Sequence, residues 1–197
     1  MCGIVGYIGK EQAAPILLEG LARLEYRGYD SAGICVAENG VLDVAKCKGR
    51  LKNLAAMTEN GALLHGTAGI GHTRWATHGE PNDINSHPHV SQNGKVALVH
   101  NGIIENYLEI REFLEEKGVQ FTSQTDSEVV AQLLEYCLGL DEVHCMQDAI
   151  YMVLHRIEGA YAFGIVCADD PERIYAARKD APLLLGYGEG CNFIASD

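Results

Sequence analysis

The chain opens with Met1-Cys2-Gly3-Ile4-Val5-Gly6-Tyr7-Ile8, a short run of small and apolar residues that carries no charged side chain. A run of this length, followed by the polar Gly9-Lys10-Glu11-Gln12, predicts a β-strand over residues 2–8. No basic segment precedes the apolar residues, so the pattern differs from that of a secretory signal peptide. The fold is therefore expected to begin with a strand whose first residue is Cys2.

Cys2 has distinctive chemistry if Met1 is removed, because its own α-amine then becomes the chain terminus. Such an amine has a pKa of about 7.7–8.0, so roughly a tenth of it is uncharged at neutral pH and accepts protons. A cysteine thiol has a reference pKa of about 8.5 and needs only modest help to ionise. Cys2 would then hold a nucleophile and its base in one residue. Taken alone, the position favours the simpler alternative, a strand that begins on a cysteine by chance.

Apolar spacing and turn residues predict the elements beyond this first strand. Helices are expected over residues 13–25, 51–57, 106–117, 127–138 and 146–156. Strands are expected over residues 33–37, 41–47, 69–73, 95–99, 160–167, 173–178, 182–186 and 191–195. Antiparallel hairpin signals combined with helices in two blocks favour an α+β fold, with sheets faced by helices.

A long polar loop is expected over residues 75–89, and loops of this length in compact domains are usually functional or disordered. His87-Pro88-His89 gives a poor zinc signal, because no Cys or carboxylate stands at ligand spacing, so we expect no metal. No cofactor is expected either. The Gly-rich Gly186–Gly190 leads to no helix and is expected to be a turn rather than a phosphate-binding loop.

Composition limits the class of protein. The 197 residues include 15 basic and 27 acidic side chains, giving a net charge of −12, and such a chain repels nucleic acid and anionic membrane surfaces. No apolar run approaches the roughly 20 residues that span a bilayer. The seven cysteines include no C-x-x-C pair, which indicates reduced thiols in a cytoplasmic protein, with all but Cys2 expected as small core residues.

One domain is expected over residues 1–197, because no linker, repeat or low-complexity segment divides the chain. The sequence ends on the strand-like Phe193-Ile194-Ala195-Ser196-Asp197 without a polar tail. We therefore expect this domain to be part of a longer protein.

Four further segments belong with the N-terminal one. They are Tyr26-Arg27-Gly28-Tyr29-Asp30-Ser31-Ala32-Gly33, His72-Thr73-Arg74-Trp75-Ala76-Thr77-His78-Gly79, His100-Asn101-Gly102-Ile103-Ile104-Glu105-Asn106 and Thr125-Asp126-Ser127-Glu128. In this order the five segments closely resemble the class II glutamine amidotransferases, which are N-terminal-nucleophile hydrolases. The resemblance covers essentially the whole chain and implies a four-layer α/β/β/α sandwich with the Cys2 strand in a central sheet.

Catalytic roles follow from the resemblance for Cys2 as the nucleophile and for Asn101 and Gly102 as the oxyanion hole. The chemistry is sound, because a side-chain amide and a backbone N–H can both point at an oxygen that gains charge. The alternative for Asn101-Gly102 is an ordinary hairpin turn.

Substrate-binding roles are implied for Arg74, as the anchor of the glutamine α-carboxylate, and for Asp126, as the anchor of its α-ammonium. A guanidinium suits a bidentate carboxylate contact. The alternative for Arg74 is a surface salt bridge. The alternative for Asp126 is a cap of the helix 127–138, a position that Thr125 could also fill.

The long loop corresponds to a lid over bound glutamine, so Trp75, Thr77 and His78 are also implied to bind substrate. Trp75 is the only tryptophan, and it either helps to control ammonia passage or simply packs locally. Gly3 and Arg27 are implied to support the N-terminal site.

The resemblance implies that the chain hydrolyses L-glutamine to glutamate and ammonia. Within the class, the segments are most similar to members that carry sugar-isomerase domains and use the ammonia to aminate fructose 6-phosphate. The resemblance also implies that the complete protein is a cytoplasmic homo-oligomer. Three alternatives remain: an amidotransferase that feeds phosphoribosyl pyrophosphate or aspartyl-adenylate chemistry, an N-terminal-nucleophile amidase or peptidase, and a non-catalytic interaction domain.

Overall fold

The computed structural model describes residues 2–75 and 80–197, and these residues form two antiparallel sheets packed face to face. The larger sheet has the strand order β3-β2-β4-β1-β10-β9, and the smaller one has the order β5-β6-β7-β8. The larger sheet consists of β1 (Gly3–Ile8), β2 (Ser31–Glu38), β3 (Val41–Lys48), β4 (Ala68–Arg74), β9 (Leu184–Gly188) and β10 (Cys191–Ala195). The smaller one consists of β5 (His89–Val90), β6 (Val96–Ile104), β7 (Gly159–Cys167) and β8 (Asp170–Lys179).

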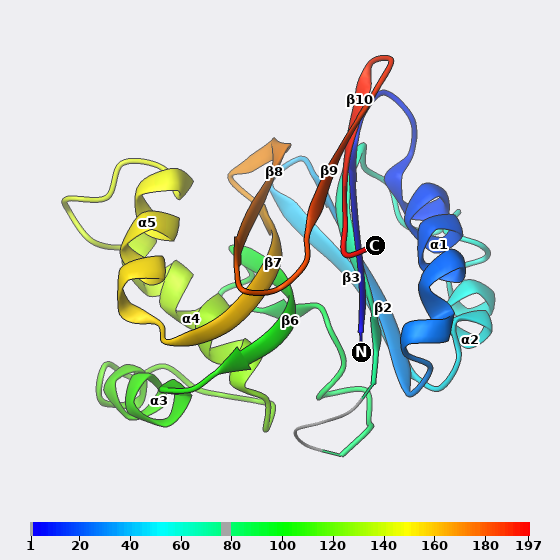
Figure 1. The fold of residues 1–197 in the computed structure, drawn as a ribbon. Helices are drawn as coiled ribbons and strands as arrows, with labels where there is room; N and C mark the ends of the chain where they lie inside the picture. Colours follow the sequence, from blue (N-terminus) through cyan, green and yellow to red (C-terminus); the bar gives the residue numbers. More distant parts are fainter. Residues whose placement is uncertain (1, 76–79) are drawn as a thin grey trace.

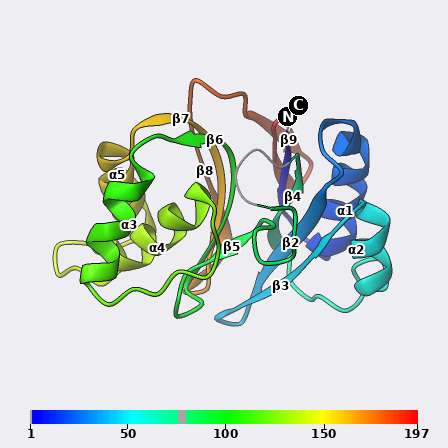
Figure 2. The ribbon, with the colours of Figure 1, turned by 90° about the horizontal axis from the view of Figure 1, so that it is seen from below.

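Helices cover the outer face of each sheet, as Figures 1 and 2 show from two directions. The larger sheet is covered by α1 (Ala13–Leu24) and α2 (Leu51–Met57), and a short 3-10 turn, η1 (Glu25–Arg27), follows α1. The smaller sheet is covered by α3 (Tyr107–Glu116), α4 (Asp126–Leu138) and α5 (Met146–Arg156). Three separate apolar cores fill the spaces between the four layers. The expected α+β sandwich of four layers, α/β/β/α, is confirmed.

The first strand lies in the interior of the larger sheet, because β1 pairs with β4 on one side and with β10 on the other. Its side chains alternate between two cores, as expected from the period of two in a strand. Ile4 packs between the sheets, whereas Val5 and Tyr7 pack against the helices α1 and α2. Burial on both faces explains why the opening sequence has no polar position. The expected central position of this strand is confirmed.

The C-terminal end of the chain lies beside the same strand, as Figure 1 shows. The Ile4 N–H donates to Ser196 Oγ at 2.9 Å, and the Ser196 N–H donates to the Ile4 carbonyl at 3.0 Å. These bonds continue the pairing of β10 with β1 toward Cys2, and thereby help to fix the backbone next to it.

Most elements lie within a few residues of their predicted bounds, and the largest difference is in β6. The sequence predicted a strand over residues 95–99, but β6 continues to Ile104. The prediction was wrong there because His100, Asn101 and Gly102 have polar or small side chains, which are typical of a strand end. In the fold these residues keep pairing with β7, so tertiary contacts override the local pattern.

The C-terminal hairpin differs from the prediction in a smaller way. The expected turn over Gly186–Gly190 is shorter, because β9 extends through Gly188 and only Glu189 and Gly190 connect it to β10. Gly190 takes a φ of +73°, which suits a glycine in a tight turn.

No helix within residues 2–75 and 80–197 combines the length and apolar character needed to cross a membrane. The seven cysteines are free thiols, but Cys145 is exposed at the start of α5, so the expectation that it lies in the core was wrong. Cys47 and Cys191 are only partly buried.

Candidate active site

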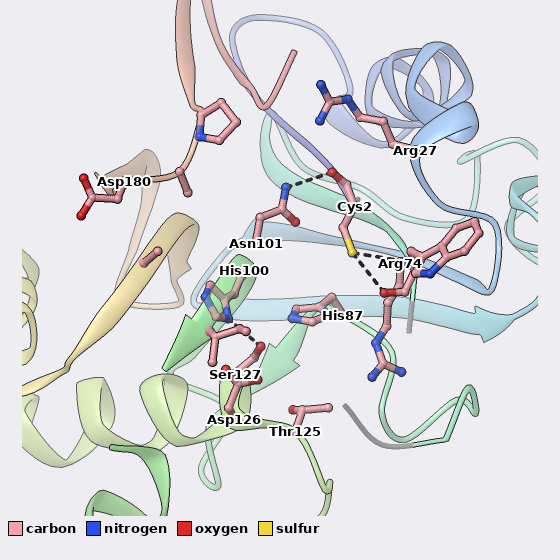
Figure 3. Close-up of a pocket in the computed structure, with 16 residues that line it drawn as sticks. Cys2, Arg27, Arg74, His87, His100, Asn101, Thr125, Asp126, Ser127 and Asp180 are labelled. Atoms are coloured by element: carbon pink, nitrogen blue, oxygen red, sulfur yellow. Dashed lines mark hydrogen bonds between the residues drawn. The ribbon is translucent and has the colours of Figure 1, made fainter. Parts of the chain in front are cut away.

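A pocket of about 340 Å³ opens where the beginning of β1, the end of β4, the outer half of β6 and the start of α4 meet. Figure 3 shows the side chains around it. Cys2, Arg74, Asn101, Gly102 and Asp126 all line this pocket, although they come from four separate segments of the chain. The fold therefore brings together the residues to which the sequence analysis gave catalytic and anchoring roles.

The Cys2 thiol lies at the pocket wall, held by the backbone of the loop that follows β4. The Trp75 N–H donates to Cys2 Sγ at 3.2 Å, and Sγ lies 3.5 Å from the Trp75 carbonyl oxygen. Burial raises the pKa of the Cys2 thiol, while the Trp75 N–H and the positive charge of Arg74 act in the opposite direction. The ionisation of this thiol is therefore set by a balance between its burial and the neighbouring donor and cation.

Asn101 faces Cys2 across the gap between the two sheets. Its Nδ2 donates to the Cys2 carbonyl oxygen at 3.0 Å, as drawn in Figure 3. The Asn101 amide is therefore fixed to the backbone of the residue that carries the thiol, and it lines the same pocket.

Asn101 and Gly102 do not form a hairpin turn, because both lie inside β6 opposite Ala162 and Tyr161 of β7. Gly102 has a φ of +126°, and a Cβ placed on it would lie 2.0 Å from the Ala160 carbonyl oxygen. Only glycine fits this backbone position. The turn alternative is therefore excluded, and the local strand departs from regular geometry where it lines the pocket.

Arg74 and Asp126 supply opposite charges to the same pocket. Arg74 is the last residue of β4 and is 4% exposed, so it is not the surface residue that the alternative required. Burial lowers the pKa of the Arg74 guanidinium, and the negative charges of Asp30, Asp126 and the ionised form of Cys2 counteract this shift. A guanidinium remains charged under these conditions.

Asp126 is the first residue of α4, and Thr125 is the residue that caps the helix. The Thr125 side chain accepts from the Glu128 N–H at 3.4 Å. The Asp126 carboxylate instead accepts from the Ile104 N–H at 2.8 Å, which ties the start of α4 to the end of β6. A buried carboxylate at a helix N-terminus is favoured by the helix dipole.

The other predicted site residues are distributed as follows. Arg27 lines the pocket, and its Nη2 donates to Asp197 Oδ2 at 2.8 Å. Gly3 is the first residue of β1, where a Cβ would lie 2.7 Å from Thr73 Oγ1. Trp75 also lines the pocket, and its half-exposed ring packs edge-on against Tyr29 at 5.3 Å. Thr77 and His78 lie outside the described residues.

Sequence reasoning missed four buried histidines that lie near one another. The His72 and His87 rings pack against each other, tilted by 31°, with centroids 4.2 Å apart, and the His89 ring lies 4.6 Å from that of His87. His87 and His100 line the pocket. The sequence analysis considered His87 and His89 only as metal ligands, and in the described part of the chain no three His, Cys, Asp or Glu side chains are grouped as a metal site would require.

Burial keeps these imidazoles neutral at physiological pH. It lowers the pKa of His72 to about 3 and that of His100 to about 4, and it places the pKa values of His87 and His89 well below the usual 6.5. Each ring therefore has one N–H donor and one acceptor nitrogen. In His87, neither ring nitrogen has a hydrogen-bond partner within residues 2–75 and 80–197, and this ring lines the pocket.

A lysine clamp holds the segment that carries His87. Lys46, on β3, donates from Nζ to the carbonyl oxygens of Ile84, Ser86 and Pro88 at 3.3, 2.9 and 3.1 Å. All three N–H donors of the ammonium are thus matched to acceptors. A Cβ on Gly33 would lie 2.1 Å from the His87 carbonyl oxygen, so this segment lies directly on the larger sheet.

Comparison with known proteins places this geometry among enzymes that use glutamine. Residues 72–197 match the family model described as a glutamine amidotransferase domain. The whole chain is 61% identical to the glutamine–fructose-6-phosphate aminotransferase [isomerizing] of Caldanaerobacter subterraneus subsp. tengcongensis, and it is 53% identical to that of Clostridium tetani. It covers 32% of the length of each of these relatives.

A solved structure shares the fold. The glutamine phosphoribosylpyrophosphate amidotransferase of B. subtilis, in complex with ADP and GMP, superposes with a TM-score of 0.84 and 31% identity. The match covers 99% of this chain and 42% of that one.

Proposed function

Because the chain belongs to the family of glutamine amidotransferase domains, we propose that it hydrolyses L-glutamine to L-glutamate and ammonia, with Cys2 as the nucleophile. The observation that carries the proposal is the convergence of the Cys2 thiol, the Asn101 amide, Gly102 and two opposite charges on one pocket. A thiol beside donors for an oxyanion supports acyl transfer, and the charges suit a free amino acid.

In the proposed reaction, removal of Met1 exposes the α-amine of Cys2, which takes the proton from the thiol directly or through a water molecule. The thiolate attacks the δ-carboxamide carbon, and the developing oxyanion is stabilised by the Asn101 side-chain N–H and the Gly102 backbone N–H. The C–N bond then breaks, the amine returns its proton to the leaving nitrogen, and ammonia departs. Water hydrolyses the γ-glutamyl thioester, which releases glutamate and restores the thiol.

The two charged anchors define the substrate class. Arg74 binds the α-carboxylate and Asp126 binds the α-ammonium, so only an amino acid with both groups free satisfies both. A peptide lacks one of these charges, which disfavours the amidase and peptidase alternatives. Trp75, Thr77 and His78 are proposed to close over bound glutamine, and Gly3 and Arg27 to support the N-terminal segment.

The complete protein is proposed to pass the ammonia to fructose 6-phosphate, bound by a sugar-isomerase region outside residues 1–197. This chain spans about a third of the relatives whose names include that sugar, and its identity to them reaches 61%. Its identity to the phosphoribosylpyrophosphate enzyme is 31%, which supports the sugar acceptor over that alternative. We further propose that residues 1–197 are one domain of a cytoplasmic homo-oligomer.

The proposal is tested by intact mass spectrometry before and after treatment with 6-diazo-5-oxo-L-norleucine, together with an assay of glutamate release. We expect a mass that lacks Met1, one covalent adduct mapped to Cys2, and glutamate and ammonia formed in equal amounts. A Cys145→Ser variant is the matched control, because it removes an exposed thiol outside the pocket and should label and turn over normally.

Other outcomes would overturn the proposal. Retained Met1 with an unlabelled Cys2 and no glutamate release would favour a non-catalytic interaction domain. Cleavage of peptides without cleavage of glutamine would favour the amidase or peptidase alternative.

A further inference from the structure

We propose that His72 is a positioning residue whose ring N–H fixes the orientation of the Asn101 side-chain amide, so that an amide N–H faces the substrate carbonyl. This inference rests on the proposed function, because it concerns the oxyanion donor of that reaction. It assigns a role to a fully buried histidine that is not itself among the residues lining the pocket.

The two side chains meet between the sheets. His72 lies on β4 of the larger sheet, between Ile4 of β1 and Gly33 of β2, and it is fully buried. Asn101 lies on β6 of the smaller sheet. His72 Nε2 lies 2.9 Å from Asn101 Oδ1 and 3.1 Å from the His100 carbonyl oxygen. One ring nitrogen therefore links the larger sheet to two consecutive residues of β6.

The partners determine which atoms carry hydrogen. The His100 carbonyl oxygen only accepts hydrogen bonds, so His72 Nε2 must donate and must carry the ring proton. The Asn101 atom that faces Nε2 must then be an acceptor, which is its amide oxygen. The contact of Asn101 with Cys2 indicates the same amide orientation. The Cys2 carbonyl oxygen only accepts hydrogen bonds, so the Asn101 atom 3.0 Å from it must be the nitrogen of the NH₂ group.

This arrangement leaves one amide hydrogen for the reaction. Of the two hydrogens on Asn101 Nδ2, one is directed to the Cys2 carbonyl oxygen, and the other is available on the side of the pocket that Asn101 lines. A rotation of the amide by 180° would set NH₂ against the His72 N–H and oxygen against the Cys2 carbonyl oxygen. It would also present an oxygen to the developing oxyanion, so the rotated state could not stabilise it.

The surroundings keep the His72 proton on Nε2. Burial lowers the pKa of this imidazole to about 3, so it stays neutral at physiological pH. Its ring packs against that of His87, and in the described part of the chain Nδ1 has no hydrogen-bond partner. The tautomer with hydrogen on Nε2 is therefore the one that satisfies the neighbours.

The test compares three replacements of His72 in the glutaminase assay. A glutamine side chain can place an amide N–H close to the position of imidazole Nε2, whereas an asparagine side chain reaches only the position of Nδ1. We expect His72→Leu and His72→Asn to lower kcat by about tenfold to a hundredfold, with KM changed less than about twofold, because an oxyanion donor acts in the transition state. His72→Gln should recover most of the lost kcat.

Two further measurements separate positioning from general damage. In an Asn101→Ala background, which should itself lose about a hundredfold or more in kcat, His72→Leu should cost nothing further. The rate at which iodoacetamide alkylates Cys2, followed on the Cys2 peptide by mass spectrometry, should be unchanged in every His72 variant. Alkylation displaces iodide from a saturated carbon and forms no oxyanion, so it reports the thiol alone.

Each contrary result has a distinct meaning. If the unmodified chain hydrolyses glutamine and His72→Leu keeps full kcat, the inference is wrong and the proposed function stands. Losses that multiply in the double variant, or alkylation that slows in proportion to kcat, would also overturn it. If His72→Leu fails to fold, the comparison of His72→Gln with His72→Asn tests the inference instead. Equal kcat in these two variants would refute it. An unmodified chain that releases no glutamate would instead refute the proposed function.

Discussion

At the scale of single residues, Arg74 gives the sharpest test of substrate binding. Arg74→Lys keeps the positive charge but loses the planar fork that can hold a carboxylate through two hydrogen bonds. Hydrogen bonds to charged groups are worth about 1.5–3 kcal/mol, so we expect KM for glutamine to rise about tenfold to a hundredfold. The kcat should change much less, because the α-carboxylate is remote from the carboxamide that reacts. Steady-state glutamate release measures both constants.

A matched change elsewhere controls for the substitution itself. Arg23 lies on the exposed side of α1, paired with Glu19, and Arg23→Lys should leave both constants unaltered. An Arg74→Lys variant with the original KM would show that Arg74 does not anchor the substrate.

At the scale of elements, the irregular part of β6 predicts a steep cost for a single methyl group. Gly102→Ala would place a Cβ 2.0 Å from the Ala160 carbonyl oxygen on β7, in addition to the strain of a φ of +126°. We expect the free energy of unfolding to fall by about 3 kcal/mol or more, as for other backbone and overpacking clashes. Urea denaturation measures the loss.

A second glycine isolates the contribution of the clash. Gly94, in the hairpin between β5 and β6, also has a positive φ, +71°, but nothing lies within 4 Å of the place that its Cβ would occupy. Gly94→Ala should therefore cost about 1 kcal/mol, from backbone strain alone. Equal losses in the two variants would contradict the proposed steric limit at Gly102.

The clamp on the segment before β5 gives another prediction for an element. Lys46→Met keeps most of the aliphatic stem but removes the donors to the Ile84, Ser86 and Pro88 carbonyl oxygens. Each hydrogen bond contributes about 0.5–1.5 kcal/mol net, so we expect the loss of three to lower the free energy of unfolding by about 1.5–4.5 kcal/mol in urea denaturation. KM for glutamine should also rise, because this segment carries His87 into the pocket wall.

The assay belongs at pH 7, because burial lowers the pKa of Lys46 to about 8 and only the protonated amine has three donors. Lys48→Met changes an exposed lysine two residues along β3 and should leave stability and KM unaltered. Equal behaviour of the two variants would show that the clamp has no effect on the site.

The same elements show what the sequence could and could not predict. Helices α2 and α5 match their predicted bounds, because amphipathic spacing is a local property of the chain. The end of β6 was missed, because its residues 100–104 are held as a strand by pairing with β7, nearly sixty residues away. When a strand continues through polar and small residues, the local sequence gives no sign that the strand goes on.

At the scale of the whole molecule, the site forms only because the two sheets pack face to face. The resemblance predicted that Cys2, Arg74, Asn101 and Asp126 belong to one site, but only the fold shows how four segments meet. His72 was missed for a related reason. Every residue of β4 is buried, so its sequence has no alternation to indicate which side chains face the other sheet.

The same sheet interface predicts that the protein loses stability at mildly acidic pH. His72, His87, His89 and His100 have folded-state pKa values far below the value of about 6.5 expected in the unfolded chain. Between these values the unfolded chain binds more protons, so stability is complete above pH 6.5 and falls as the pH decreases toward 4. Each such proton changes the free energy of unfolding by about 1.4 kcal/mol per pH unit.

Urea denaturation at pH 7.5, 6.5, 5.5 and 5.0 measures this slope, in a range above the ordinary pKa values of Asp and Glu carboxyls. His72→Gln removes one of the four groups and should reduce the slope by close to one proton. His65 is exposed at the surface, and His65→Gln should leave the slope as it was. A stability that stays constant from pH 7.5 to 5.0, or an unchanged slope in His72→Gln, would mean that these imidazoles accept protons without unfolding. The buried histidine rings would then need water or hydrogen-bond partners for their added protons. The close packing around β4 and β6 leaves no room for such partners.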